Sequence, residues 1–439
     1  MAGPKRLTLD KVLDHAAETH AKRPALLVVD GPGMNYAELR SRVRAFSSLL
    51  AGLGVEHGDR VAILGENMPN WGVAYFGVTT MGAVAVPILP EFHASAVQHI
   101  LRHSESKVAV VSRKLLPKIE DGQLEGLDTI LLMEDFEPAN GEAPAQRDPF
   151  RDAFKATVKE IEKLKALAKT AFEGKDADPD APESDTQEVD AAASDDAPAT
   201  DGEFAASDAP QTRMEVFRKR FQAGMREIER IKEKTLKRAG DHAAPPEHAI
   251  AEDDLAAIIY TSGTTGHSKG VMLTHRNIVS NAIDTAALAG LTASDRMVSI
   301  LPLSHTFECT LGLVLPITAG ASVAYLGRPP TPKVLLPALA KVRPTFLLCV
   351  PLVVEKIFKN RIQPQFTKNF ATRRLYGLGP VRRKMHAVAG RKLVEAFGGE
   401  LRCLCIGGAP LAPEVERFLR DGDFPFAVGY GKSHYFTFF

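Results

Sequence analysis

The sequence predicts an α/β protein whose mainly parallel sheets are covered by helices on both faces. Strand-like and helix-like segments alternate through residues 1–136, and the alternation returns after residue 250. In βαβ alternation each helix carries the chain back, so that the next strand runs parallel to the last. The apolar fraction of 45% and the charged fraction of 25% are those of a globular protein. A length of 439 residues corresponds to roughly two or three domains.

The first part of the chain supplies most of the clear periodic segments. Short apolar runs predict strands at Ala25–Val29, Asp59–Leu64, Ala83–Val86, Lys107–Val111 and Thr129–Leu132, and helical spacing predicts helices at Tyr36–Leu53 and Trp71–Met81. Gly58 before the second strand is typical of a turn. Trp71, the one tryptophan of the sequence, is expected in the core.

Residues 137–250 interrupt the alternation, and we interpret them as an insertion. Residues 173–210 carry 13 acidic residues and one lysine, with too few apolar side chains to form a core, which predicts disorder. Apolar residues recur at helical spacing on either side, and Arg213–Arg238 holds 10 basic and 4 acidic residues. Two interpretations stay open. The segments either form a helical hairpin, or residues 211–238 form a basic amphipathic helix that contacts anionic lipid.

The most informative stretch is Tyr260–Gly270, with the sequence Y-T-S-G-T-T-G-H-S-K-G. It follows the apolar run Leu255–Ile259, which predicts a strand. Glycines let backbone N–H groups approach an anion, hydroxyls add neutral donors, and Lys269 adds a positive charge. The order Ser-Lys-Gly differs from the Walker A motif. A short strand at Val271–Leu273 and a helix capped by Thr274 are expected to follow. The pattern predicts a loop that binds a polyphosphate.

Composition excludes several classes of protein. The chain has 54 basic and 54 acidic residues, which argues against nucleic-acid binding as a property of the whole chain. The spacing of the four cysteines (Cys309, Cys349, Cys403 and Cys405) predicts buried thiols in a reducing compartment and no metal site. Two long apolar stretches, Trp71–Pro90 and Cys309–Leu326, are interrupted by Gly and Pro, which favours helix–turn–strand units over membrane spans. Because the N-terminus also lacks the apolar region of a signal peptide, we expect a cytoplasmic protein.

The stretch Tyr260–Gly270 resembles the phosphate-binding motif of the adenylate-forming superfamily, which includes acyl-CoA synthetases, firefly luciferase and peptide-synthetase adenylation domains. Other segments agree in the family order: Gly58–Val61 with Asn67-x-Pro69-x-Trp71, Leu301–Glu308, Val350–Ile357, Gly407–Leu411 and Gly429–Gly431. The segment Val350–Ile357 resembles the long-chain fatty-acyl-CoA synthetase branch. The resemblance implies a large N-terminal adenylate-forming domain of stacked, mainly parallel sheets, plus a helical and partly disordered insertion.

The resemblance also implies a reaction and its residues. In the family, a fatty carboxylate attacks the α-phosphate of ATP, magnesium pyrophosphate leaves, and CoA then attacks the acyl-adenylate. The matching catalytic candidates are Lys269 and His305, with His305 beside the acyl carboxylate. Candidate nucleotide-binding residues are Thr261, Ser262, Gly263, Thr264, Thr265, Gly266, Lys269, Gly407, Gly408, Ala409, Pro410, Tyr430 and Gly431. Thr261 is also the candidate Mg²⁺ ligand, through its hydroxyl.

Three further residues and two apolar segments carry weaker signals. Glu308 is interpreted as either a helix cap or a pocket carboxylate, and Glu355 and Lys356 as an exposed pair on a helix face, which contributes little free energy. Residues 301–315 and 346–353 are apolar enough to line an acyl tunnel, since each buried CH₂ gains about 0.8 kcal/mol. The length of the acyl chain cannot be derived from them.

The end of the sequence departs from the family pattern. The family has Thr-Glu soon after the Tyr-Gly pair, whereas this chain has Lys432 to Tyr435, K-S-H-Y, so that the glutamate which shares Mg²⁺ is missing. We therefore divide the chain into residues 1–136, 137–250 and 251–431 and an aberrant tail, 432–439. We expect the C-terminal lid domain to be absent and turnover to be impaired. A frameshift, a gene-model error and a true short form stay open as its origin.

Two other functions also stay open. One is a non-catalytic protein that binds nucleotide or fatty acid, or that interacts with partners through residues 151–172 and 211–238. The other is a ligase whose acceptor is acyl-carrier protein instead of CoA, because the acceptor surface belongs mostly to the lid domain. The sequence specifies neither the oligomeric state nor attachment to a membrane.

Overall fold

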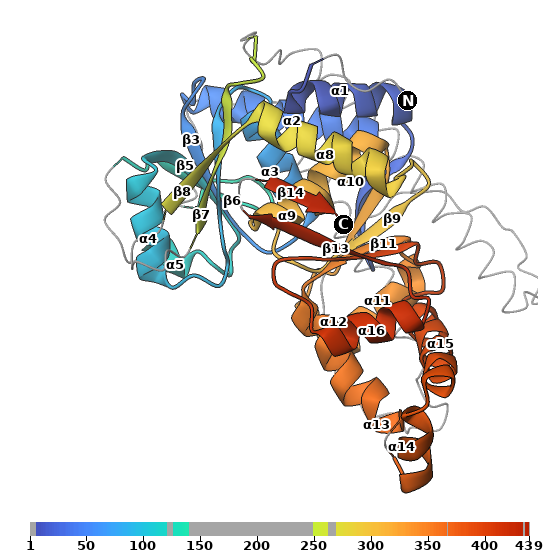
Figure 1. Cartoon of the computed structure of the whole chain (residues 1–439). Helices are drawn as coiled ribbons and strands as arrows, with labels where there is room; N and C mark the ends of the chain where they lie inside the picture. The colour runs from blue at the N-terminus through green and yellow to red at the C-terminus, as the bar shows by residue number, and fades with distance from the viewer. Residues whose placement is uncertain are drawn as a thin grey trace, which may run out of the picture. The chain divides into compact units, whose positions relative to one another are not determined.

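The computed structural model describes residues 6–120, 126–139, 249–261, 269–366, 368–432 and 435–438. Its strands form two sheets, one of eight strands in the order β14-β13-β12-β11-β9-β10-β1-β2 and one of six in the order β6-β5-β3-β4-β7-β8 (Figure 1). Neighbouring strands are parallel except where β2, β8 and β14 pair antiparallel with β1, β7 and β13. The prediction of an α/β fold with mainly parallel sheets is confirmed.

The six-stranded sheet is buried on both faces at its centre. Its strands are β3 (Arg60–Leu64), β4 (Val84–Ile88), β5 (Ser106–Val111), β6 (Thr129–Leu132), β7 (Leu255–Thr261) and β8 (Lys269–Thr274), and its helices are α3 (Pro69–Thr79), α4 (Ala94–His103) and α5 (Pro117–Glu120). All five residues of β4 and all residues of α3 from Trp71 on are buried. Strands covered on both faces lose the apolar–polar alternation and become continuously apolar. The stretch Trp71–Pro90 is therefore a buried helix followed by a buried strand, as predicted.

The eight-stranded sheet contains β1 (Pro24–Val28), β2 (Gly33–Asn35), β9 (Arg296–Ser299), β10 (Ser322–Tyr325), β11 (Phe346–Cys349), β12 (Cys403–Ile406), β13 (Phe426–Lys432) and β14 (Tyr435–Phe438). Successive side chains of its strands enter different cores. Met297 of β9 belongs to one core and Val298 to another, and Leu347 and Leu348 of β11 divide in the same way. Successive side chains of a strand point to opposite faces. Both faces of this sheet are thus covered by apolar layers.

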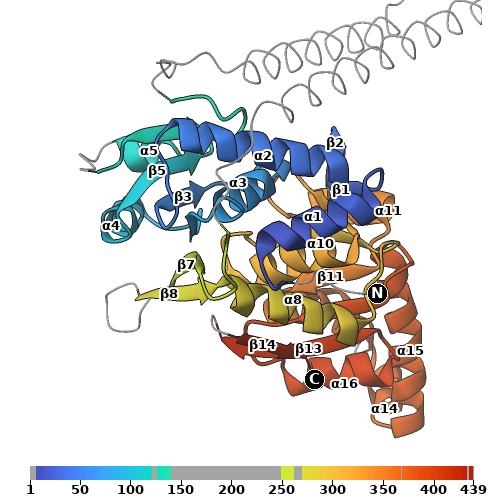
Figure 2. The same ribbon diagram turned by 90° about the horizontal axis from the view of Figure 1, so that it is seen from above.

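Helices form a layer between the two sheets (Figure 2). The layer contains α3 together with α1 (Leu9–His20), α2 (Tyr36–Gly52), α8 (His275–Ala289), the π-helical turn η1 (Cys309–Val314) and α10 (Leu315–Ala319). This core also contains apolar side chains of both sheets, such as Val61 of β3 and Val323 of β10. The stacked arrangement that the sequence predicted is therefore present.

A second group of helices covers the outer face of the eight-stranded sheet. It contains α11 (Pro332–Val342), α12 (Pro351–Ile357), the π-helical turn η2 (Phe358–Ile362), α13 (Gln363–Phe366), α14 (Phe370–Tyr376), α15 (Gly379–Ala396) and α16 (Pro413–Asp421). Phe358, Leu393 and Phe418 of this group pack with Leu404 and Ile406 of β12. Helix α14 lies at the far end of the group in Figure 1.

The predicted elements of the first 136 residues are all present, with ends that shift by no more than two residues. The four cysteines are free thiols, and Cys403 and Cys405 lie on β12. The described part of the chain contains no helix with both the length and the hydropathy of a membrane span. The predicted helices and acidic linker of the insertion lie in residues 140–248, outside the described residues, and so does the loop 262–268.

Candidate functional site

The candidate residues gather where parallel strands of the eight-stranded sheet end. The segment Leu301–Glu308 follows β9, Val350 follows β11, and Gly407–Leu411 follows β12. Because β9, β11 and β12 are neighbouring parallel strands, their carboxyl ends lie along one edge of the sheet. Open α/β sheets bind their ligands at this edge. The fold thus brings together three motifs that are far apart in the sequence.

The phosphate-loop motif begins and ends on a hairpin of the six-stranded sheet. Thr261 ends β7, Lys269 begins β8, and the two residues face each other in the antiparallel register. Their positions place a hydroxyl and an exposed lysine at the base of the connecting loop. The other five residues of this loop that the sequence singled out, Ser262, Gly263, Thr264, Thr265 and Gly266, lie outside the described residues. Thr274 accepts a hydrogen bond from the Asn277 N–H at 3.2 Å and caps α8, as predicted.

His305 immediately precedes the short helix α9 (Thr306–Glu308) and caps it. Its Nδ1 accepts a hydrogen bond from the backbone N–H of Phe307 at 3.3 Å. The ring retains exposed surface, but the protein packed around it removes enough water to lower the pKa of His305 below its usual value. A neutral imidazole that accepts at Nδ1 carries its proton at Nε2. His305 therefore offers a neutral N–H donor.

Glu308 is buried three residues further on. Its Oε1 accepts a hydrogen bond from the Ser299 hydroxyl at 2.6 Å, and Ser299 Oγ in turn accepts one from Asn67 Nδ2 at 2.8 Å. Burial raises the pKa of Glu308 to about 8, so the carboxyl is protonated at neutral pH. Its second oxygen, Oε2, is buried and has no hydrogen-bond partner among the described residues. Glu308 makes no side-chain hydrogen bond that caps the following π-helical turn, and its role as a pocket carboxylate stays a prediction.

Asn67 connects the two sheets at this point, because it follows β3 of the six-stranded sheet. Besides Ser299, its Nδ2 donates to the carbonyl of Leu301 at 2.6 Å, and its Oδ1 accepts from the Leu303 N–H at 2.9 Å. Gly312 completes the surroundings, since a Cβ there would lie 2.6 Å from Glu308 Cδ. The motif N-x-P-x-W included Asn67, but no sequence pattern indicated the roles of Ser299 and Gly312.

The turn after β12 is shaped by its glycines. The Gly407 N–H donates to the Cys349 carbonyl at 3.1 Å, which joins the ends of β12 and β11. Gly408 has φ +89°, a conformation that favours glycine, and Gly408, Ala409 and Pro410 are exposed. The turn therefore presents open backbone at the edge of the sheet.

Glu355 has a more specific role than that of the exposed pair proposed for it. Its Oε1 accepts a hydrogen bond from the Ala412 N–H at 3.1 Å, at the start of α16. The carboxylate thereby ties α12 to the segment that follows Gly407–Leu411, whereas Lys356 is exposed. A contact between residues 57 positions apart leaves no periodic signal in the sequence.

Tyr430 and Gly431 lie on β13, where they pair with Thr437 and Phe436 of β14. The hairpin of β13 and β14 includes most of the tail that the sequence set apart at residue 432. Because β13 pairs with β12 in parallel, the backbone of Tyr430 and Gly431 lies next to the carboxyl end of β12.

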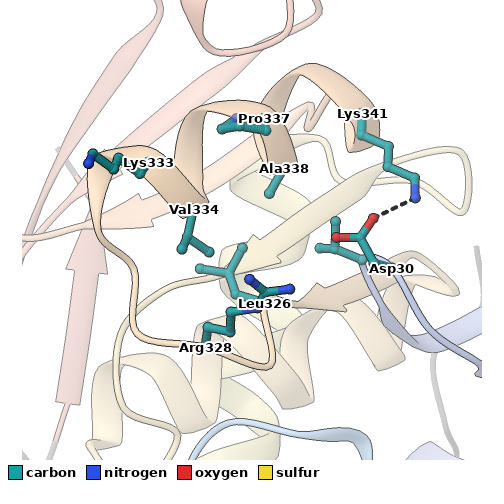
Figure 3. Close-up of a pocket in the computed structure, with 9 residues that line it drawn as sticks. Asp30, Leu326, Arg328, Lys333, Val334, Pro337, Ala338 and Lys341 are labelled. Carbon is teal, nitrogen blue, oxygen red and sulfur yellow. Dashed lines mark hydrogen bonds and ion pairs between the residues drawn. The ribbon is translucent and has the colours of Figure 1, made fainter. Parts of the chain in front are cut away.

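A pocket of about 260 Å³ lies beside these segments, at the carboxyl ends of β1 and β10 (Figure 3). Leu326, Val334 and Ala338 give it apolar walls. Lys341 Nζ donates to Asp30 Oδ1 at 2.8 Å, and this hydrogen bond and the lysine's charge lower the pKa of Asp30. The pocket is also lined by Arg328 and Lys333, which make no ion pair with another described residue, so it combines apolar walls with positive charge. The sequence analysis singled out none of these residues.

A family model described as "AMP-binding enzyme" matches residues 13–434. The chain belongs to this AMP-binding family. The match covers nearly all of the sequence, including the segments at β7, β9, β12 and β13 that carried the resemblance.

Curated relatives of this AMP-binding protein include fatty-acid ligases. Long-chain-fatty-acid–CoA ligase FadD15 of Mycobacterium bovis is 27% identical over 420 residues, which cover 90% of this chain and 55% of that protein. Long chain acyl-CoA synthetase 6, peroxisomal, of Arabidopsis thaliana is 32% identical over 180 residues, which cover 38% of this chain and 25% of that protein. The chain thus spans about half of the length of FadD15, and its match to the plant protein is confined to a shorter segment.

Solved structures of the family share the fold. The crystal structure of a long-chain-fatty-acid-CoA ligase (FadD1) from Archaeoglobus fulgidus superposes with a TM-score of 0.61 at 18% identity and covers 99% of this chain and 65% of that one. The N-terminal domain of FACL13 from Mycobacterium tuberculosis gives 0.60 at 18% identity, with 97% and 76% covered. At such low identity these similarities establish the fold, and the expected adenylate-forming N-terminal architecture is confirmed.

Proposed function

We propose that this AMP-binding protein takes part in long-chain fatty acid–CoA ligation. A fatty acid and ATP would form an acyl-adenylate and pyrophosphate, and CoA would then displace AMP to give the thioester. The observation that carries the proposal is the convergence of the His305 segment and the Gly407–Gly408 turn at one sheet edge. The similarity to FadD15 over 90% of the chain favours a fatty acid as substrate.

The hairpin of β7 and β8 is the proposed phosphate-binding element. Lys269 would neutralise charge on the departing pyrophosphate, and preorganised charge of this kind is the main contribution in phosphoryl and adenylyl transfer. Thr261 would give Mg²⁺ one hydroxyl oxygen, the ligand type that this ion prefers. The described residues contain no cluster of three His, Cys, Asp or Glu side chains that could hold a metal. A hydroxyl oxygen from Thr261 suits Mg²⁺, and phosphate and water oxygens would supply the remaining ligands. The ion would supply charge neutralisation to the leaving group.

His305 and Glu308 would set the charge of the acyl side. A neutral His305 can donate a hydrogen bond from Nε2 to a fatty carboxylate without withdrawing its negative charge by proton transfer. Glu308, kept protonated by burial, adds no negative charge that would repel the substrate. The apolar segments 301–315 and 346–353 are proposed to supply surface to the alkyl chain, and within them residues 309–314 and 346–349 are buried.

Pyrophosphate release from ATP and Mg²⁺ in the presence of a long-chain fatty acid tests the proposal. We expect Lys269→Ala to lower the rate by about 10²–10³-fold. Lys114→Ala is the matched control, because Lys114 is an exposed lysine at the end of β5 that pairs with Glu66 at 2.9 Å. Equal behaviour of the two variants would contradict the assigned role of the loop.

Calorimetry with MgATP and with fatty acid separates the alternatives. Binding of both ligands without pyrophosphate release would support the non-catalytic binder, and binding of neither would overturn the proposal. Where pyrophosphate is released, comparison of CoA with acyl-carrier protein as acceptor identifies the thiol. If thioester forms with the carrier protein but not with CoA, then the carrier protein is the acceptor in place of CoA.

A further inference from the structure

The helices that follow β11 carry an unusual distribution of charge. Residues 356–394 contain 11 Lys and Arg and no Asp or Glu, although the whole chain has 54 basic and 54 acidic residues. Arg382 pairs with Asp421 of α16 at 3.1 Å, and the other ten make no ion pair with a described residue. All ten are exposed. Ion pairs within the described residues therefore do not explain why so many basic side chains gather on these helices.

Buried aromatic side chains anchor the same helices. Phe366 of α13 stacks on Tyr376 of α14, with ring centroids 5.1 Å apart, and the Tyr376 hydroxyl makes a 2.8 Å hydrogen bond to His386 of α15. His386 also lies 5.3 Å from the ring of Phe418 on α16. Helix α14 is thereby fixed to α15 and α16 through its inner side chains.

Three large apolar side chains on α14 and next to it are exposed to solvent instead of joining this aromatic cluster. Phe370 is 78% exposed, Leu378 is 54% exposed and Leu375 is 48% exposed. They lie within nine residues of one another and are interleaved with Arg373 and Arg374. Single exposed apolar residues are common, whereas several of them close together on one short segment are typical of an interaction surface. Figure 1 shows α14 at the end of these helices, away from β13 and β14.

We propose that this surface docks on an anionic lipid bilayer. The α14–α15 surface is formed by Lys368, Phe370, Arg373, Arg374, Leu375, Leu378, Arg383 and Lys384. The arginines and lysines complement lipid phosphates, and Phe370 and its leucine neighbours can enter the boundary between headgroups and acyl chains. An acidic protein would satisfy the positive charge alone, whereas a bilayer also removes the apolar side chains from water.

Neighbouring acidic groups leave this positive surface largely intact. The adjacent helix α16 carries Glu414, Glu416 and Asp421. Glu416 pairs with Arg420 of its own helix at 2.6 Å, and Asp421 with Arg382. The inference goes beyond ligation, because lipid binding needs no turnover and can be measured separately.

Vesicle flotation with the full chain tests the inference. We expect binding to vesicles of phosphatidylcholine and phosphatidylglycerol at 7:3, little binding to phosphatidylcholine alone, and release at high salt. R373Q/R374Q/R383Q/K384Q should weaken partitioning by at least about tenfold, since each basic residue near an anionic surface contributes severalfold. K22Q/R102Q removes two exposed charges elsewhere that make no ion pair with another described residue, and it should bind as the wild type does.

A second pair of variants tests the apolar side chains of the α14–α15 surface. Phe370→Ala should weaken binding severalfold, whereas Leu288→Ala on α8, where Leu288 is 66% exposed, should not. Unchanged melting temperatures would confirm that the substituted side chains play no part in folding. Equal binding by wild type and R373Q/R374Q/R383Q/K384Q would overturn the inference.

Two further outcomes would also overturn it. K232Q/K234Q/K237Q tests the basic segment 211–238, and if this variant alone loses vesicle binding, that segment is the lipid contact. If the α14–α15 arginines instead retain acyl-carrier protein while wild-type chain ignores anionic vesicles, the surface serves an acidic protein.

Discussion

The two sheets are built from the same parallel βα units, yet their carboxyl edges differ in how completely their polar groups are paired. At the six-stranded sheet, Glu66 accepts from the Ser112 hydroxyl at 2.6 Å, and Arg113 pairs with Asp135. At the eight-stranded sheet, the buried Ser304 Oγ and Glu308 Oε2 have no hydrogen-bond partner among the described residues. An unpaired buried polar group costs about 1–3 kcal/mol. Ser112 and Asp135 thus satisfy Glu66 and Arg113 at one edge, whereas Ser304 Oγ and Glu308 Oε2 at the other edge keep unused hydrogen-bonding capacity.

Two carboxyl groups show the same contrast. Although burial opposes it, hydrogen bonds from Ser112 and Lys114 lower the pKa of Glu66, which is therefore ionised at neutral pH. Burial raises the pKa of Glu308 to about 8. One edge holds its carboxylate with compensating donors, and the other holds a neutral acid beside His305. The two carboxyl groups therefore differ in charge at neutral pH, although each follows the carboxyl end of a parallel strand.

Asn67→Ala should have the largest effect on stability, because Asn67 connects the two edges. Alanine removes three hydrogen bonds to the segment after β9 and leaves the Leu303 N–H without its acceptor. We expect a loss of about 3 kcal/mol, measured by denaturant unfolding. Asn70→Ala is the control, since Asn70 bonds the carbonyls of Met133 and Glu134 at the six-stranded edge and should lose about 1 kcal/mol. If both variants lost the same stability, the hydrogen bonds of Asn67 would be no more important than those of Asn70.

Glu308→Gln should separate the two carboxyl groups by the sign of their pH dependence. Below about pH 4.5 Glu308 is protonated in both folded and unfolded chains, so the wild type pays no penalty there. As the pH rises toward 8, only the unfolded chain ionises, and the wild type loses stability relative to Glu308→Gln. The gap should grow by roughly 1 kcal/mol per pH unit, or about 2 kcal/mol between pH 5 and pH 7.

Glu66→Gln should behave oppositely in the same unfolding series. The lowered pKa of Glu66 means that its ionised form stabilises the folded chain above the unfolded pKa, and this contribution disappears as the pH falls through the folded pKa. Glu66→Gln should therefore be least stable, relative to the wild type, at neutral pH. Parallel curves for the two variants would show that Glu308 is not held in its neutral form.

Much of this fold could be predicted from local sequence patterns. Continuous apolar runs predicted β3 to β6 within two residues, and glycine and hydroxyl residues marked the β7–β8 connection. The antiparallel pairing of β8 and the order of strands could not be predicted, because they depend on packing between distant segments. The sequence motifs singled out His305 and Gly407–Pro410 as candidate site residues. They did not predict the Asn67–Ser299–Glu308 hydrogen-bond network, which joins residues 232 positions apart, or the hydrogen bond from Ala412 to Glu355.

Gly312→Ala tests how tightly the unpaired edge is packed. The added methyl group would lie 2.6 Å from Glu308 Cδ and Oε1, so the buried carboxyl or the π-helical turn must shift. Overpacking of this kind should lower stability by about 1–2 kcal/mol and disturb the Ser299 hydrogen bond. Gly379→Ala is the control, because a Cβ there meets no atom within 4 Å. A neutral Gly312→Ala would mean that the turn accommodates Glu308 loosely.

Arg113→Gln, at the carboxyl edge of the six-stranded sheet, should have the smallest effect on stability. Arg113 is 58% exposed, and its ion pair with Asp135 is screened by water. We expect a loss of no more than about 0.5 kcal/mol, which should vanish at 1 M salt. Arg328→Gln at the other edge removes no ion pair with a described residue and should not change stability at either salt concentration. If Arg113→Gln instead cost as much as Asn67→Ala, charges at the six-stranded edge would be part of its packed structure, and pairing alone would no longer distinguish the two edges.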